Sequence, residues 1–224
     1  MTFGQVCAEL YPLLLKGMGV TIQITVVSLL IAMVLGLLSC VMGMSKLLPL
    51  QWISKIYIWL IRGTPLLVQV FFIYFGFPQL MQMMGVGLRL TPFTAGVITL
   101  SLNAGAYMSE IFRGGIQAVP PGQMEAARSL GLSHGRAMMK VILPQAMRIC
   151  IPSLVNQFII SLKDTSIISV ISLAEIVYQA KIYMGRTMKS FYTWTLVGVF
   201  YLILITIITI ISRRVERRLQ NDER

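Results

Sequence analysis

Charged residues are scarce in this chain of 224 residues: Asp, Glu, Lys and Arg together make up 12% of it, against about a quarter in soluble globular proteins. Hydrophobic residues make up 56%. A soluble surface with so few charges would carry large apolar patches, and such patches are rare on monomers. The composition therefore excludes an ordinary soluble enzyme and a disordered tail, and it predicts an integral membrane protein.

Cysteine and histidine are also too few for several kinds of site. The three cysteines, Cys7, Cys40 and Cys150, lie far apart without any C-x-x-C spacing, and the single histidine is His134. This pattern predicts neither a disulfide framework nor a metal site. The sequence also lacks the G-x-x-x-x-G-K-[ST] and G-x-G-x-x-G phosphate-binding patterns, so we expect no nucleotide site and no catalytic residues in this chain.

The net charge of +11 arises because acidic residues are fewer than basic ones, 8 against 19. A basic chain can bind nucleic acid, but here the Lys and Arg residues do not form a run with interleaved aromatics. Membrane proteins instead collect Lys and Arg in their cytoplasmic loops. We therefore expect contact with membrane lipid and no nucleic-acid binding.

Long runs with few charges define five predicted membrane spans in one domain, residues 1–224. A helix needs about 20 mainly apolar residues to cross the hydrocarbon core. The spans cover about residues 18–44, 57–82, 91–112, 149–173 and 191–212. We expect an all-α integral membrane fold.

The distribution of Lys and Arg sets the orientation, because cytoplasmic loops are enriched in them. With the N-terminus outside and the C-terminus inside, most of the 19 Lys and Arg residues fall on the cytoplasmic side. The external side then holds Lys16, Arg89, Lys181, Arg186 and Lys189. The segment 175–189 is then an external loop, which can include a short interfacial helix.

The long loop between the third and fourth spans, about residues 118–144, has a helical pattern of its own. Pro120 and Pro121 end one helix and begin another. Gly131 suits a helix C-terminus that needs positive φ, and Ser133 suits the N-cap of a second helix starting near His134. The loop is therefore predicted to hold two short helices at the cytoplasmic face, with a further bend at Pro144.

Within this loop, Glu125-Ala126-Ala127, three residues, Gly131, nine residues, Val141, one residue and Leu143-Pro144 resemble the "EAA" loop of permease subunits of binding-protein-dependent ABC importers. Val141 stands where the family usually has Ile. Three further segments resemble the polar amino-acid branch of that family. They are Arg62-Gly63-Thr64-Pro65, Asn103-Ala104-Gly105-Ala106-Tyr107 and Lys163-Asp164-Thr165-Ser166.

The resemblance implies a type I ABC importer permease in the bacterial cytoplasmic (inner) membrane. The first helix of the loop would be a coupling helix that docks on a separate ATP-binding cassette subunit, which would hold the ATP and Mg²⁺. Other implied partners are an external solute-binding protein, a polar amino-acid substrate, and a second permease copy or paralogue that completes a dimer. The residues implied in coupling are Glu125, Ala126, Ala127, Gly131 and Leu132.

Polar residues inside the predicted spans are candidates for the substrate path, because charges in a membrane face protein or water rather than lipid. Lys163 and Asp164 could face the carboxylate and the amine of a zwitterion; alternatively, they belong to an interhelical ion-pair network. The other candidates could serve helix packing instead. Arg62 could act in a gate or be a cytoplasmic anchor, and Glu110 could simply pair with Arg113 at the spacing i, i+3. These other candidates are Asn103, Asn156, Gln157, Thr165, Arg62 and Glu110.

Two alternative functions follow from the same residues. Lys163 and Asp164 could form a relay in an ion-driven secondary transporter, or the chain could be a membrane scaffold without a solute path. The energy source of uptake separates the first alternative from an ATP-driven importer. The sequence leaves open which amino acid is carried and whether the dimer is homomeric or heteromeric.

Overall fold

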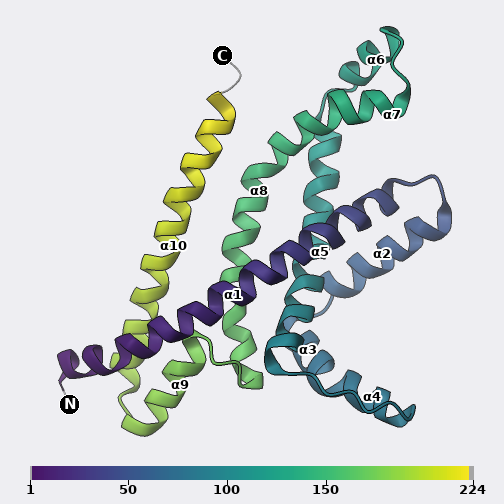
Figure 1. The fold of residues 1–224 in the computed structure, drawn as a ribbon. Helices are drawn as coiled ribbons and strands as arrows, with labels where there is room; N and C mark the ends of the chain where they lie inside the picture. Colours follow the sequence, from purple (N-terminus) through teal and green to yellow (C-terminus); the bar gives the residue numbers. More distant parts are fainter. Residues whose placement is uncertain (1, 222–224) are drawn as a thin grey trace.

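The computed structural model describes residues 2–221, and all of its regular elements are helices (Figure 1). In chain order these are α1 (Phe3–Met44), α2 (Leu48–Arg62), α3 (Leu66–Phe71), the π-helical η1 (Phe72–Gly76), α4 (Phe77–Met83), α5 (Pro92–Ala118), α6 (Pro121–Ser129), α7 (His134–Ala137), the π-helical η2 (Met138–Ile142), α8 (Leu143–Asp164), the 3₁₀-helical η3 (Thr165–Ile171), α9 (Ile176–Thr187) and α10 (Ser190–Asn221). The all-helical prediction is confirmed for these residues.

Within residues 2–221, four helical stretches are long and apolar enough to cross a membrane. They are Phe3–Met44, Leu66–Met83, His134–Ile171 and Ser190–Ser212. The 27-residue α5, which holds the predicted third span, is not among them. It carries many small and polar residues and is covered mainly by α1 and α8. A helix enclosed by other helices needs less apolar surface than one that faces lipid.

The first helix is much longer than the predicted span 18–44. It begins at Phe3, where the Gln5 Oε1 atom accepts a hydrogen bond of 2.8 Å from the backbone N–H of Thr2. At 1.5 Å per residue its 42 residues extend about 63 Å, twice the thickness of a hydrocarbon core of about 30 Å. Accordingly, α1 packs along α5, where Ile24 meets Gly96 and Gly36 meets Met108, and its N-terminal part extends further to pack with α9 and α10 (Figure 1).

The predicted second span, residues 57–82, is not one continuous helix. The helix breaks at Gly63–Pro65, between α2 and α3. Proline has no N–H to continue the helical ladder, and the residue before it disfavours the helical conformation. The break places Arg62, Thr64 and Pro65 in a turn beside α5.

The predicted fourth span, residues 149–173, is the second half of a longer helical run. Helical structure continues from His134 through α7, η2, α8 and η3 to Ile171. At Pro144, where a bend was predicted, the run stays helical and contains the π-helical turn η2 directly before the proline. A wider turn relieves the clash between the proline ring and the carbonyl four residues earlier.

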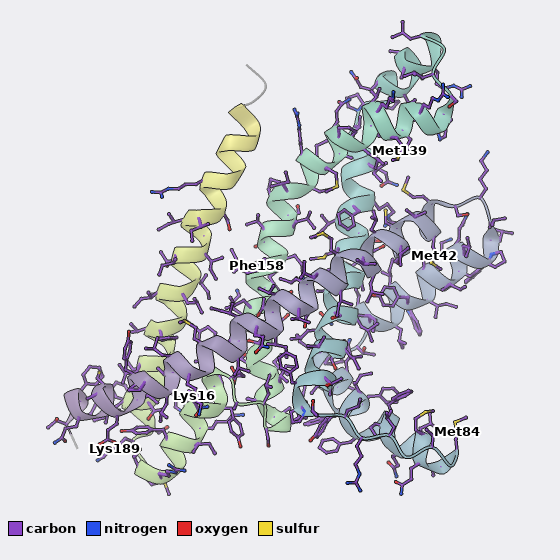
Figure 2. All side chains as sticks on the ribbon, in the orientation of Figure 1. Lys16, Met42, Met84, Met139, Phe158 and Lys189 are labelled. Carbon is purple, nitrogen blue, oxygen red and sulfur yellow. The ribbon has the colours of Figure 1, made fainter. Side chains whose placement is uncertain are left out.

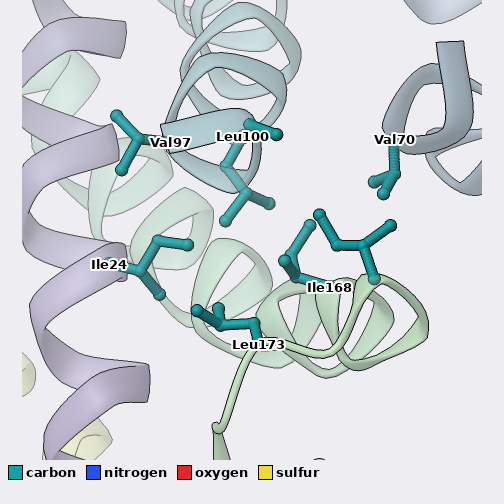
Figure 3. Packing of buried hydrophobic residues seen from close by; sticks show 8 residues of the cluster. Ile24, Val70, Val97, Leu100, Ile168 and Leu173 are labelled. Atoms are coloured by element: carbon teal, nitrogen blue, oxygen red, sulfur yellow. The ribbon is translucent and has the colours of Figure 1, made fainter. Parts of the chain in front are cut away.

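The core lies where α1, α3, α5 and η3 meet (Figure 3). Ile24, Val70, Leu100 and Ile168 pack together there. Close approach of α1 and α5 depends on Gly36, since a Cβ atom there would lie 2.7 Å from the Cβ of Met108. This packing fixes α5 as the central helix of the molecule.

The segment predicted as an external loop, 175–189, contains the helix α9. Its buried residues Ile176, Ala180 and Tyr183 pack in a cluster with α1 and α10. The predicted short helix is therefore present, and it is packed against other helices on one side.

Candidate functional site

Two adjoining hollows lie along α5 and α8, beside the turn between α2 and α3. We name them the Asp164 hollow and the Glu110 hollow, of about 400 and 420 Å³. The Asp164 hollow is lined by Thr64, Pro65, Leu66, Asn103, Tyr107, Gln157, Ile160 and Asp164. The Glu110 hollow is lined by Arg62, Tyr107, Glu110, Ile111, Gly114, Gly115, Ile149, Cys150, Ser153 and Gln157. They share Tyr107 and Gln157 and so form one groove.

The groove arises from helical periodicity. On α5, positions 103, 107, 110 and 114 follow spacings of three and four, and positions 150, 153, 157, 160 and 164 do the same on α8. Residues at such spacings share one helix face. The two helices approach closely at Gly115, where the Cys150 thiol donates to the Ile111 carbonyl at 3.3 Å. A largely polar face of each helix therefore borders the same groove.

The Asp164 hollow brings together three residues that the sequence proposed separately: Asn103, Gln157 and Asp164. Two side-chain amides and one carboxylate offer both donors and acceptors. Small-molecule sites are concave and carry a few such polar groups. The hollow is therefore suited chemically to a small polar molecule with a cationic group.

The Glu110 hollow is bordered by a cluster of charges. Glu110 Oε2 lies 2.6 Å from Arg113 Nη2 and 3.5 Å from Arg62 Nη1. The Arg62 guanidinium also lies 5.3 Å from the centroid of the Tyr107 ring, a cation–π contact. Arg62 thus links the α2 end to α5 at the border of the two hollows, and the predicted i, i+3 pair of Glu110 and Arg113 is present.

The turn that carries Arg62 is held by Gln69, a residue that the sequence analysis did not single out. Pro65 cannot donate to the carbonyl of Ile61, and the Gln69 Nε2 atom donates to that oxygen at 2.7 Å. The same amide nitrogen lies 3.0 Å from both the carbonyl and the hydroxyl oxygen of Thr64. An unpaired carbonyl at membrane depth is costly, so Gln69 replaces the hydrogen bonds that proline removes.

Gln69 also reaches the groove indirectly, because its Oε1 atom accepts from Asn103 Nδ2 at 3.0 Å. The sequence signal that could have identified it is an isolated amide four residues after a proline in an apolar run. Tyr107, which lines both hollows, lay within the quoted Asn103–Tyr107 motif but was given no role.

Three other path candidates lie outside the two hollows. Lys163 and Asn156 are both exposed on the single chain. Thr165 is fully buried and its hydroxyl donates to the Leu162 carbonyl at 2.7 Å, which is a contact within its own helix. None of the three lines the groove.

The predicted coupling residues form a small helical tip at the end of the molecule that is opposite Lys16 and Lys189 (Figure 2). In α6, Glu125 and Ala126 are exposed and Ala127 is buried. Gly131 has φ +84°, as expected for a helix that ends in a left-handed residue.

Two backbone hydrogen bonds complete this helix end: Leu132 N donates to Ala127 O and Gly131 N to Arg128 O, at 3.2 and 3.0 Å. They form a Schellman motif. Leu130, between them, is 85% exposed, and Met139 nearby is 67% exposed (Figure 2). The tip therefore presents apolar side chains outward on a rigid turn.

Among residues 2–221, no group of three or more His, Cys, Asp and Glu side chains could hold a metal ion. The groove offers amide and carboxyl groups and the charge cluster of Arg62, Glu110 and Arg113.

The sequence matches the family described as "Binding-protein-dependent transport system inner membrane component" over residues 28–221. It is 37% identical over 212 residues to the arginine transport system permease protein ArtQ of Bacillus subtilis (strain 168), covering 95% of this chain and 94% of that protein. It is 41% identical over 213 residues to the glutamine transport system permease protein GlnP of Escherichia coli (strain K12), covering 93% and 94%.

Solved structures agree with these relatives. The structure described as an amino acid ABC transporter with histidines has a TM-score of 0.89 and 38% identity, covering 97% of this chain and 99% of that one. The MetNI methionine ABC transporter, at 19% identity and a TM-score of 0.73, covers 92% and 96% and shows the fold alone. The chain belongs to the family of binding-protein-dependent transport system inner membrane components.

Proposed function

We propose that this chain is the membrane subunit of an ATP-driven importer that moves a polar amino acid inward across a bacterial cytoplasmic (inner) membrane. The observation that carries the proposal is the groove, which offers amides and a carboxylate at membrane depth in a chain whose near-full-length relatives are named as amino-acid permeases. The chain itself supplies no ATPase site; ATP and Mg²⁺ bind to a partner subunit.

In this proposal the chain crosses the membrane five times, with its N-terminus outside and its C-terminus inside. Four of these crossings are the long apolar stretches named above, and α5 adds the remaining one, the third in chain order. Its 27 residues give about 40 Å of helix, enough for a hydrocarbon core of about 30 Å. Placing the α6–α7 tip inside agrees with the excess of Lys and Arg on that side. Lys16 and Lys189 then lie outside.

The α6–α7 tip is the coupling segment. The exposed Leu130 enters a groove of the ATPase subunit, Glu125 and Ala126 flank it, and Gly131 keeps the turn in shape. ATP can favour one permease state only if the ATPase binds these tips with different free energy in the two states. The partners of the complete transporter are two ATPase subunits, a second permease copy or paralogue, and an external solute-binding protein.

The Asp164 hollow is the substrate site and the Glu110 hollow continues the path. Asp164 receives the amine of the zwitterion, while Asn103 and Gln157 donate to its polar groups. Lys163 and Asn156 lie beside the groove on faces that the second permease subunit covers, and Thr165 supports the end of α8. Arg62 and Glu110 form the closure between the groove and the cytoplasm.

A reconstitution experiment tests this function. The chain is tagged, purified in mild detergent with whatever ATPase accompanies it, and placed in vesicles with ATP inside. Uptake of radiolabelled L-arginine, L-glutamine, L-histidine and L-cystine is measured with the external binding protein present. We expect uptake of at least one of them that requires ATP and persists when ion gradients are collapsed. Uptake that follows an ion gradient instead, from a chain that purifies alone, would contradict the proposal.

A further inference from the structure

The turn between α2 and α3 stands between the two hollows and contributes to both. Its Arg62 lines the Glu110 hollow, whereas Thr64 and Pro65 line the Asp164 hollow. Any movement of this turn therefore changes both hollows together, including the distance from Arg62 to Glu110.

Gln69 is the residue that fixes the turn. Its amide nitrogen bonds to Ile61, at the end of α2, and to Thr64, within the helix break, and its amide oxygen bonds to Asn103 on α5. The side chain is nearly fully buried and lies outside the Asp164 hollow. With every polar atom engaged, Gln69 holds one orientation, because each alternative would leave a buried polar group unpaired.

Asn103 is shared between Gln69 and the groove. One N–H of its amide is donated to Gln69, while the residue also lines the Asp164 hollow. A solute that hydrogen-bonds to Asn103 competes for the orientation of this amide. Solute binding therefore changes the Asn103–Gln69 hydrogen bond, although the solute does not contact Gln69 itself.

We propose that Gln69 is a positioning residue that couples occupancy of the Asp164 hollow, through Asn103, to the position of the α2–α3 turn and so to the Arg62–Glu110 pair. The inference rests on the proposed function in treating that hollow as the solute site. In the empty groove, the Asn103–Gln69 bond holds the turn in place. When solute engages Asn103 the bond weakens, the turn is released, and Arg62 moves relative to Glu110. Because such coupling is reciprocal, weakening the turn also changes the affinity for solute.

The experiment uses the intact transporter in nanodiscs and compares Gln69→Leu, Asn103→Ala and the double variant. Spin labels at Trp59→Cys and Gln117→Cys, in a background without the three native cysteines, report the distance from the end of α2 to α5 by pulsed electron paramagnetic resonance. Both positions are exposed, and neither lines one of the two hollows. Gln79→Leu, an exposed glutamine on α4, is the matched control.

We expect Gln69→Leu and Asn103→Ala to broaden the distance distribution alike. The double variant should broaden it no further, because both substitutions remove the same Asn103–Gln69 hydrogen bond. We expect Gln69→Leu to reduce solute-stimulated ATPase activity about tenfold while complex yield stays near that of the wild type. Gln79→Leu should change none of these. A distribution that Asn103→Ala leaves unchanged, or solute coupling that survives in Gln69→Leu, would overturn the inference.

A second variant separates coupling from simple support of the turn. Pro65→Ala restores a backbone N–H at position 65 that can donate to the Ile61 carbonyl, so Gln69→Leu combined with Pro65→Ala should regain the thermal stability of the wild type but not its solute stimulation. If the combination restores both, Gln69 is only structural and the inference fails. A different outcome separates this inference from the proposed function. If none of the four amino acids stimulates the ATPase activity of the wild type, the proposed function fails. If the two single variants then still broaden the distance distribution alike, the link from Asn103 through Gln69 to the turn stands.

Discussion

Glu175, at the residue scale, is a buried acid in the external segment that follows the fourth predicted span. Its side chain is 0% exposed. Its Oε1 atom accepts from the backbone N–H of Tyr178 at 2.6 Å, and its Oε2 atom from the hydroxyl of Tyr201 at 3.4 Å. Burial raises the pKa of this carboxyl from 4.5 to about 7, against the lowering effect of these hydrogen bonds and of Lys181.

This raised pKa predicts that the transporter becomes less stable as pH rises. An acid whose pKa is higher when folded binds its proton more tightly in the folded state, so its contribution is complete below pH 4.5 and is lost as pH rises through about 7. The full effect is about 3 kcal/mol, or roughly 6–12 °C in melting temperature. Thermal unfolding in detergent from pH 4.5 to 8.5 measures it. The Glu175→Gln variant should remove most of the dependence, and an unchanged slope in that variant would contradict the assignment.

Gln69 and Glu175 show that a single polar residue can be structurally important even where the sequence analysis did not single it out. Both are single polar residues that looked incidental in the sequence, and both are buried with named partners from other helices. Asn103 could be proposed from its position inside a span, but its partner could not. Hydrogen bonds between residues 34 apart in the chain depend on how helices pack.

Glycines set how closely the helices approach, and Gly17 gives a prediction at the element scale. A Cβ at Gly17 would lie 2.8 Å from backbone atoms of Glu175 and Ile176, whereas Gly19 on the same helix faces open space. Gly17→Ala should therefore push α9 away from α1 and lower stability by about 1–3 kcal/mol. Gly19→Ala is the matched control and should not destabilise. Melting temperatures of the purified variants check this. Equal melting temperatures for Gly17→Ala and Gly19→Ala would refute the close contact at Gly17.

Gly131 gives a second prediction for an element, the α6–α7 tip. Its φ of +84° costs a residue with a side chain about 1–2 kcal/mol, and Gly131→Arg adds bulk where the ATPase is proposed to dock. We expect Gly131→Arg, and more mildly Glu125→Ala, to cut ATP-driven uptake about tenfold or more while membrane insertion is unaffected. Gly185→Arg, at a glycine in α9 outside this tip, without positive φ and with open space around it, is the control. Normal coupled uptake in Gly131→Arg would refute the role of this tip.

At the scale of the whole molecule, the groove is open on one side in the single chain. Lys163 is exposed beside it, and a charge at membrane depth that faces lipid is costly. By contrast, α10 exposes a series of large apolar side chains between Phe191 and Ile211, which suit contact with lipid. We therefore expect a second permease subunit to cover the groove side of α5 and α8.

Cross-linking tests this arrangement. In a cysteine-free background, Ser153→Cys on the groove face should give a dimer-sized product with a flexible bifunctional maleimide in membranes. Thr206→Cys, exposed on α10, should react with the reagent without forming that product. The identity of the linked partner distinguishes a homodimer from a heterodimer. Equal cross-linking at both positions would argue against the proposed interface.

The sequence by itself determined the helical fold class, the helix starts at Pro121 and His134 and the left-handed turn at Gly131, because these follow from composition and from local backbone chemistry. Tertiary structure alone decided that Gln69 holds the turn after Arg62 through its bonds to Ile61 and Asn103, and that Asn103, Gln157 and Asp164 meet in one hollow. It also decided which polar residues are withdrawn from the groove, such as Thr165. The physical reason is that a local signal acts within one helical turn, whereas the partner of a buried polar group is chosen by the packing of helices distant in the chain.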